Sequence, residues 1–337
     1  MRCFALAQAW QDSGGDCIFA MAESTPAVER RLQEKGMKVE RLTAGVATAE
    51  DAKQTGHLAD KENAAWIVVD GYQFRSAYQS AIKAAGFKML LVDDHVHAET
   101  YSADLVLNQN IHADASLYAQ REPSTRLLLG PRYAMLRREF RRWRNWQREI
   151  PRRGRKILVT MGGSDPDNVT SRVIEAIRQL ANPGLETVVL VGGSNPHLCS
   201  VQASLPKESM RLITDADNVA DWMTWADVAV AGAGTTIWEM CFLGLPSILL
   251  VLADNQQGAA AAADKMGFAW SVGSGTEMTA SVIAGKLTEL FNSSDQRTSQ
   301  SEKGQKLVDG RGAERVVQAM RDIERDTPLN WDWVITS

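Results

Sequence analysis

Short apolar runs rich in β-branched residues alternate with segments of helical period along the whole chain. The first half has such runs at 17–21, 66–70, 89–92 and 105–107, and the second half at 156–161, 187–191, 210–213, 228–231 and 247–252. Helix candidates such as 28–35 and 74–85 lie between them. Continuous apolar strands that alternate with helices are typical of parallel sheets covered on both faces. Two such sets predict an α/β protein of two Rossmann-like domains.

The two sets are separated by a basic segment that ends at Pro151. Residues 135–150 resemble a helix whose apolar positions fall near one stripe, at Leu136, Phe140, Trp143 and Ile150. We therefore expect an N-terminal domain over 1–150, a C-terminal domain over 151–326 and a tail over 327–337. Residues 292–305 are polar and predict a loop, and 312–325 predicts a last helix. The tail carries Trp331 and Trp333 at alternate positions and could pack back across a domain.

Composition narrows the function classes. The chain has 337 residues, 45% of them hydrophobic, and a net charge of −4, which gives no global attraction to nucleic acid or an anionic membrane. The longest apolar run, 247–252, is far shorter than the ~20 residues that span a bilayer, so no stable membrane insertion is expected. Four scattered cysteines without CxxC spacing argue against zinc or disulfides and for a reduced, cytoplasmic setting. The arginines of 135–155 allow a membrane or nucleic-acid patch, but Glu139 and Glu149 interrupt them and favour a solvated linker.

Glycine-rich turns at strand ends carry the strongest chemical signal. In residues 230–239 a buried strand ends, small residues turn the chain, and a helix begins at about Thr235. Free N–H groups at a helix N-terminus suit a phosphate, and Glu239 lies where it can accept hydrogen bonds from ribose hydroxyls. The alternative is a plain strand-to-helix turn with a threonine cap. A second such turn, 160–168, contains Gly162 and Gly163 and offers Asp167 or Asn168 as a helix cap.

Polar residues also follow strands in other places. Residues 214–223 read as a strand end and a capped helix, which is compatible with binding a base or with capping alone. In the first half, polar side chains at strand ends predict a cleft constellation, with Asp70, Tyr72, Asp93, Asp94, His95, Asn108 and Asn110 as its members. Adjacent carboxylates such as Asp93 and Asp94 usually point apart, so a paired acid and base is the less favoured interpretation. His95 and His97 lack a third metal ligand at convincing spacing, so no metal is expected. His57, His112 and His197 read as surface or loop residues.

Taken together, these motifs resemble a known family. The runs MGGSDPDN, DNVADWM, AGAGTTIWE and LADNQ, with VDGYQF, VDDHVHAETYSADLVLNQN, GPRYAMLRREF and DGRGAERV, cover nearly the whole chain. Their order is similar to that in the GT-B-like hydrolases of UDP-2,4-diacetamido-2,4,6-trideoxy-β-L-altropyranose, which act in pseudaminic acid biosynthesis. That family releases free sugar and UDP without a metal or other cofactor.

The resemblance implies a role for particular residues. It places UDP in the C-terminal domain, with Val219 at the uracil, Glu239 at the ribose, and Gly163, Ser164, Gly234, Thr235 and Thr236 at the diphosphate. The sugar is implied to lie in the cleft between the domains, near Asp70, Tyr72, Asp94, Asn108, Asn255 and Gln256. Tyr72 and Asn255 are expected to face each other there. The implied catalytic residues present in the chain are Tyr72, Asp70 and Asp94, and the implied partner is a UDP-sugar. The oligomeric state stays open.

The resemblance also implies a missing catalytic group. In the family, a first strand and a Gly-x-Gly-His turn precede Met-Arg-Cys, which here are Met1, Arg2 and Cys3. About 15 to 20 residues are therefore expected to be absent, which would leave two neighbouring strands with unpaired edges. No histidine matches the family's catalytic position, and His95 is the nearest substitute. A shorter protein with a different mechanism is the competing hypothesis. A glycosyltransferase with the same UDP site and a non-catalytic UDP-sugar binder are the alternative functions.

Overall fold

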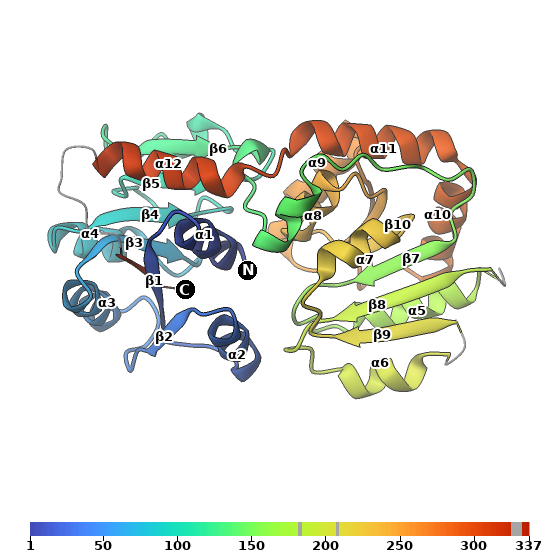
Figure 1. Ribbon diagram of the computed structural model, residues 1–337, viewed down its shortest axis with the longest axis horizontal. Coiled ribbons are helices and arrows are strands. Elements are labelled where there is room, and N and C mark those ends of the chain that lie inside the picture. The colour runs from blue at the N-terminus through green and yellow to red at the C-terminus, as the bar shows by residue number, and fades with distance from the viewer. Residues whose placement is uncertain (181–183, 207–208, 325–331, 337) are drawn as a thin grey trace. The chain divides into compact units, whose positions relative to one another are not determined.

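The structure is a computed structural model that describes residues 1–180, 184–206, 209–324 and 332–336. The chain divides into two compact units, Met1–Arg138 with Gly310–Ser337, and Glu139–Asp309 (Figure 1). Each unit is a parallel sheet whose strands alternate with helices, so the predicted α/β class with two Rossmann-like sheets is confirmed. The division after Arg138 differs from the break expected near Pro151, and the chain returns to the first unit at Gly310.

Unit 1 is built on a sheet of order β2-β1-β13-β3-β4-β5-β6. Its strands are β1 (Asp16–Met21), β2 (Lys38–Arg41), β3 (Ala64–Asp70), β4 (Lys88–Val92), β5 (Leu105–Asn108), β6 (Arg126–Leu129) and β13 (Asp332–Thr336). Its helices are α1 (Arg2–Gln11), α2 (Pro26–Glu34), α3 (Ala49–Lys61), α4 (Ser76–Ala84) and α12 (Gly312–Glu324), with 3-10 turns η1 (Ala115–Tyr118) and η2 (Pro131–Tyr133).

The C-terminal strand β13 lies in the interior of this sheet. It pairs in parallel with β1 on one side, where Trp333 is opposite Cys17, and with β3 on the other, where Trp333 is opposite Trp66. The expectation that two neighbouring strands have unpaired edges is therefore wrong, because β13 provides hydrogen-bond partners for both. Trp333 of the predicted tail is part of this strand, whereas Trp331 lies outside the described residues.

Alternate residues of the unit 1 strands face two separate cores, as the two-residue period of a strand requires. Trp333 and Ile335 face a core that includes α1 and α12, whereas Val334 faces a core that includes α3 and α4. The Trp333 ring stacks on that of Trp10, with centroids 3.9 Å apart. Both faces of the sheet are thus covered, which explains the continuous apolar runs in its strands.

Unit 2 has a sheet of order β12-β11-β10-β7-β8-β9. Its strands are β7 (Lys156–Thr160), β8 (Glu186–Val191), β9 (Met210–Thr214), β10 (Val228–Gly232), β11 (Ser247–Val251) and β12 (Trp270–Ser274). Its helices are α5 (Val169–Arg178), α6 (Leu198–Ser204), α7 (Val219–Trp225), α8 (Thr236–Phe242), α9 (Gln257–Met266), α10 (Ala280–Asn292) and α11 (Ser294–Leu307), with a 3-10 turn η4 (Asp254–Gln256). A core beneath α5 and α10 includes Val173, Ile177, Ile283 and Leu287.

The basic segment is not the expected helix. Residues Arg138–Trp143 form a 3-10 turn, η3, and no α-helix is found over 135–150, all of which is described. Side chains from other segments bind the start of this stretch, since Gln109 Oε1 accepts from the N–H of Met135 and Gln8 Oε1 from that of Arg138. Further on, the Arg148 guanidinium donates to the carbonyl oxygens of Met223, Ala226 and Leu243. Met223 lies in the last turn of α7, Ala226 directly follows α7, and Leu243 directly follows α8.

The expected loop at 292–305 is also wrong, because residues Ser294–Leu307 form helix α11. Its buried face is polar and small rather than apolar, with Arg297, Gln300, Ser301 and Gly304 buried. Gln300 accepts a hydrogen bond from the N–H of Ser247, and Arg297 donates to the carbonyl oxygens of Leu290 and Phe291 at the end of α10. Pattern analysis that follows apolar stripes cannot detect such a helix. The predicted last helix is confirmed as α12.

Within the described part of the chain, no helix combines the length and apolarity that crossing a bilayer requires. The four cysteines, all of them described, are free thiols.

Candidate functional site

The loops after β7 and β8 come together at the carboxyl edge of the unit 2 sheet. Gly162, Gly163 and Ser164 are exposed directly after β7. A Cβ atom at Gly192, just after β8, would lie 2.5 Å from the carbonyl oxygen of Gly163, so that approach requires glycine. Exposed backbone with small side chains is the arrangement that lets an anionic ligand approach N–H groups closely.

The helix that follows the β7 loop is capped by a residue that the sequence did not single out. The buried Asp165 carboxylate accepts hydrogen bonds from the N–H groups of Val169 and Thr170 and from the Thr170 hydroxyl. The expected caps, Asp167 and Asn168, do not provide it, and Asn168 sits in a left-handed conformation with no side-chain cap bond. Because a carboxylate already occupies the N-terminus of α5, that helix end is not free to hold a phosphate.

The turn between β10 and α8 follows the strand next to β7 in the sheet. Gly232 and Ala233 are buried, Gly234 and Thr236 are partly exposed, and Thr235 is exposed as the N-cap without a side-chain cap bond. Glu239 lies in the first turn of α8 and is partly buried.

The segment after β11 reaches this turn. The Gln256 side-chain nitrogen lies 3.7 Å from the position that a Cβ at Gly234 would occupy, while its oxygen accepts from the Leu252 N–H. Asn255 precedes it in η4, and Val219 is the first residue of α7, beyond the end of β9. The structure therefore gathers the residues predicted for the diphosphate and the ribose, together with Gln256, in the segments that follow the adjacent strands β7, β10 and β11.

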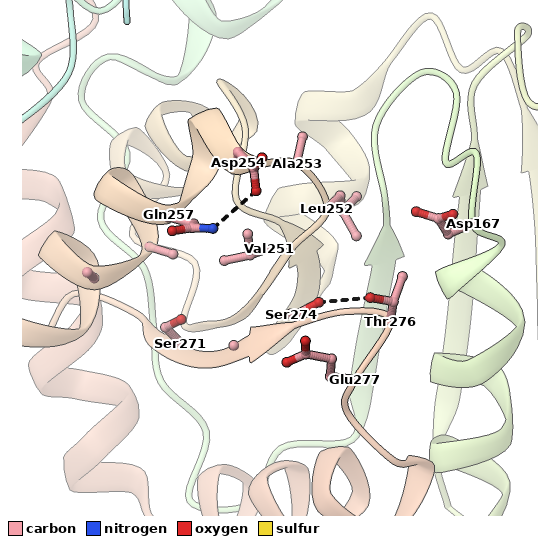
Figure 2. Close-up of a pocket in the computed structure, with 13 residues that line it drawn as sticks. Asp167, Val251, Leu252, Ala253, Asp254, Gln257, Ser271, Ser274, Thr276 and Glu277 are labelled. Atoms are coloured by element: carbon pink, nitrogen blue, oxygen red, sulfur yellow. Dashed lines mark hydrogen bonds between the residues drawn. The ribbon is translucent and has the colours of Figure 1, made fainter.

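A pocket of about 540 Å³ lies at the carboxyl ends of β11 and β12, beside η4 (Figure 2). The predicted Asn255 and Gln256 do not line it, whereas their neighbours Asp254 and Gln257 do and are hydrogen-bonded to each other. Its remaining polar side chains come from the β7 loop and from β12 and the segment after it, namely Asp167, Ser271, Ser274, Thr276 and Glu277. Sequence reasoning named Asp167 only as a helix cap and missed Ser271, Ser274, Thr276 and Glu277, because β12 has no apolar run and its five residues are all partly exposed.

At the carboxyl edge of the unit 1 sheet, Arg2 joins two of the predicted carboxylates. Its guanidinium lies 2.6 Å from Asp70 at the end of β3 and 2.6 Å from Asp94 after β4. Cys3 donates a further hydrogen bond to Asp70. Burial raises the pKa of Asp70, and the charge and hydrogen bonds of Arg2 lower it by more, so the Asp70 pKa stays below its ordinary value. Asp94 keeps one buried oxygen, Oδ1, that has no hydrogen-bond partner among the described residues.

Asp93 is fully buried and has different partners from Asp94. Its Oδ1 accepts from the N–H groups of His95 and Val96 and lies 3.1 Å from His97 Nδ1, while its Oδ2 accepts from the Tyr101 hydroxyl. Burial raises the pKa of Asp93, but these hydrogen bonds lower it by more, and the pKa ends below its ordinary value. The two adjacent carboxylates therefore do not form an acid–base pair.

The remaining predicted residues of unit 1 differ in accessibility. Tyr72 is 42% exposed, and its ring lies edge-on to those of His95 and His97 at 6.0 and 6.1 Å. Asn108 is 0% exposed, donates to the Tyr118 hydroxyl and accepts from the N–H of Asn110, so it shapes the loop from inside the fold. Tyr72 belongs to unit 1 and Asn255 to unit 2, and the expectation that the two face each other stays a prediction.

The described residues contain no group of three or more histidine, cysteine, aspartate or glutamate side chains placed to hold a metal ion.

Comparison with known proteins connects this geometry to sugar metabolism. Residues 157–316, which include most of unit 2 and the first residues of the chain's return to unit 1, match the model of the glycosyltransferase family 28 C-terminal domain. The chain is 26% identical to the spore coat polysaccharide biosynthesis protein SpsG of Bacillus subtilis over 238 residues, which is 70% of each chain.

Solved structures show the same fold over the full length. Acinetobacter baumannii MurG aligns with a TM-score of 0.63 at 15% identity, covering 95% of each chain. A putative UDP-N-acetylglucosamine 2-epimerase from Listeria monocytogenes aligns with a TM-score of 0.67 at 14% identity, covering 98% of this chain and 95% of that one. The chain therefore has the GT-B-like fold.

Proposed function

We propose that the chain binds a UDP-sugar through unit 2 and releases UDP from it. The observation that carries this proposal is the convergence of two small-residue turns, exposed after β7 and partly exposed after β10, within the region that matches the glycosyltransferase domain. Gly163, Ser164, Gly234, Thr235 and Thr236 hold the diphosphate through backbone N–H groups and hydroxyls. Val219 lies against the uracil, and Glu239 accepts the ribose hydroxyls.

The proposed reaction is hydrolysis at the anomeric carbon. The oxygen of water forms a bond to that carbon, the carbon–oxygen bond to UDP breaks, and UDP leaves with the electron pair. A base must take the proton of the water. Asp94 suits this role better than Asp70, because Asp94 Oδ1 has no partner among the described residues whereas Arg2 and Cys3 occupy both oxygens of Asp70. Tyr72, exposed beside them, contacts the sugar.

The proposed substrate is a UDP-linked diacetamido-trideoxy sugar of nonulosonate biosynthesis. Support comes from the run of motifs in chain order and from the similarity to SpsG, a protein named for polysaccharide biosynthesis. No metal or other cofactor takes part in the proposed chemistry.

A glycosyltransferase is the second candidate, and the match of residues 157–316 to a glycosyltransferase domain favours it. Both functions use the same UDP site and differ in what attacks the anomeric carbon, water or an acceptor hydroxyl. Turnover in the absence of an acceptor separates them.

The experiment is to incubate the purified chain with a panel of UDP-sugars and to measure UDP and reducing sugar without any acceptor. Hydrolysis gives both products in equal amounts, and Asp94→Asn abolishes them while leaving UDP affinity unchanged. Release of UDP only after an alcohol acceptor is added would favour the transferase. Binding of UDP without turnover of any UDP-sugar would leave a non-catalytic binder.

A further inference from the structure

We propose that His97 is a positioning residue, which holds the turn that presents Tyr72 and does so only while its imidazole is protonated. The proposal rests on the proposed function in one respect, namely that Tyr72 contacts the sugar. Its structural part concerns residues of unit 1 alone.

The His97 ring bridges the segments that follow β3 and β4. Its Nδ1 lies 3.1 Å from Asp93 Oδ1, and its Nε2 lies 3.3 Å from the carbonyl oxygen of Phe74. The side chain is 5% exposed and that of Asp93 is 0% exposed, so water does not readily replace either bond.

The bond to Phe74 anchors the turn that carries Tyr72. The Phe74 N–H donates to the Gly71 carbonyl, which closes a tight turn with Tyr72 inside it. Gly71 has a φ of 158° and is packed against Phe74, since a Cβ there would lie 2.9 Å from that ring. His97 therefore fixes one end of the turn, and its ring also supports the Tyr72 ring edge-on.

The two acceptors require a charged imidazole. A carboxylate and a carbonyl oxygen have no proton to give, so both ring nitrogens must donate. A neutral imidazole donates from one nitrogen and would direct a lone pair at the other acceptor. Loss of the proton thus removes the link either to Asp93 or to the Tyr72 turn.

The charged and titratable groups around His97 favour its protonated form. Asp93 contacts it directly, and Asp94, which is paired with Arg2 of α1, adds a weaker attraction. Tyr101 and Tyr118 hydrogen-bond to Asp93, and burial near that carboxylate raises the pKa of both hydroxyls, so they stay neutral. His95 lies across the Tyr72 ring, and Arg75 and Glu99 pair with each other nearby at the surface.

The resulting pH dependence has a definite sign. Burial lowers the pKa of His97, but Asp93, the Phe74 carbonyl and the charge of Asp94 together raise it by more, so the His97 pKa lies above its ordinary value of about 6.5. The stabilisation that protonated His97 gives to the Tyr72 turn is then complete below pH ~6.5, and it is lost as the pH rises through the raised pKa of His97. Asp93, with its lowered pKa, stays ionised throughout this range.

The test is NMR titration of the chain labelled with ¹³C in its histidine and tyrosine rings. The chain has five histidines and five tyrosines, and Tyr72→Phe and His97→Gln assign the two signals of interest. We expect the titration midpoint of the His97 ring to lie above pH ~6.5 and the Tyr72 signal to shift with the same midpoint. His97→Gln should abolish this step, whereas the matched control His95→Gln should preserve it. A Tyr72 signal that keeps its step in His97→Gln, or loses it in His95→Gln, would overturn the proposal.

A binding measurement adds a functional readout, with UDP-N-acetylglucosamine and UDP as probes. At low pH, His97→Gln should weaken binding of UDP-N-acetylglucosamine about fivefold, which is the contribution of one hydrogen bond. The affinity for UDP should stay unchanged. His97→Lys, which keeps a permanent donor cation, should remove the pH step. Equal weakening of both probes would indicate a general structural defect and contradict a positioning role. If neither probe binds, the proposed function fails, while the coupling of Tyr72 to His97 is still decided by NMR.

Discussion

The two units wind their sheets in the same order but fill the central position from different parts of the chain. In unit 2 the central strand β7 comes first, with β8 and β9 on one side and β10, β11 and β12 on the other. In unit 1 the corresponding position is held by β13, the last strand, with β1 and β2 on one side and β3 to β6 on the other. A sheet of this kind thus needs a strand between its two halves, and the strand does not have to precede them in sequence.

The carboxyl edges of the two sheets also differ in chemistry. At the unit 2 edge, β7 leads into the exposed Gly162 and Gly163, which suits an anionic ligand. At the unit 1 edge, β13 ends at the buried Thr336, which hydrogen-bonds to Tyr78, and a network around Arg2 and Asp93 fills the adjacent positions. The contrast agrees with the proposed division of labour, in which unit 2 binds the nucleotide and unit 1 acts on the sugar.

The largest expected effect comes from Trp333→Ala. The ring is completely buried between α1 and the sheet, so its loss should destabilise unit 1 by about 3–5 kcal/mol. Hydrogen exchange of β1 and β3 by mass spectrometry measures the loss directly. Trp270→Ala, a matched change in the edge strand β12 of unit 2, should leave exchange in unit 1 unchanged. Protection of β1 and β3 that survives Trp333→Ala would show that β13 is not the central strand.

Arg148→Met should destabilise unit 2 by about 2–4 kcal/mol, because three carbonyl oxygens lose their donor. Urea unfolding monitored by tryptophan fluorescence measures the change. The exposed Arg152 offers a control, and Arg152→Met should shift stability by less than ~0.5 kcal/mol. Equal effects of the two substitutions would mean that the Arg148 contacts contribute little.

Asp165→Ala should cost about 1–2 kcal/mol through loss of the α5 cap. Asp167→Ala, two residues away and exposed, should be nearly neutral in the same thermal unfolding assay. A larger loss of stability in Asp167→Ala than in Asp165→Ala would instead assign the cap to Asp167, as the sequence pattern favours.

Glu239→Ala should weaken the affinity for UDP about tenfold, or ~1.4 kcal/mol, if Glu239 binds the ribose. Calorimetry with UDP measures this, and Glu277→Ala, which changes a carboxylate of the β12 pocket, should leave the affinity unchanged. An unaltered affinity in Glu239→Ala would remove the ribose role.

How far the sequence predicts this fold depends on what each strand buries. Strands covered on both faces, such as β3 and β10, are continuous apolar runs and were predicted. The edge strand β2 has no fully buried residue, and β12 contains two serines and a glycine, so neither stands out from a loop. The position of β13 could not be predicted, because pairing partners more than 250 residues apart leave no local pattern.

The candidate site was predictable where a ligand would meet the backbone and less so where side chains meet each other. Glycines after β7 and β10 mark their own turns in the sequence. By contrast, Arg2 of helix α1 reaches Asp70 and Asp94, which end or follow other elements far along the chain. Asp165 was passed over because Asp167 and Asn168 lie nearer the helix start. Asn108 illustrates the opposite error, since a polar residue at a strand end can serve the interior.

In the proposed reaction, water attacks the anomeric carbon of a UDP-sugar held by this chain. The most direct test is turnover of the accepted UDP-sugar in water enriched in oxygen-18, without any acceptor, followed by mass spectrometry of both products. Attack of water at the anomeric carbon gives one heavy oxygen in the released sugar, corrected for exchange of the free sugar, and none in UDP. Heavy oxygen in UDP would mean that the phosphorus–oxygen bond breaks instead, and absence of any acceptor-independent turnover would contradict hydrolysis itself.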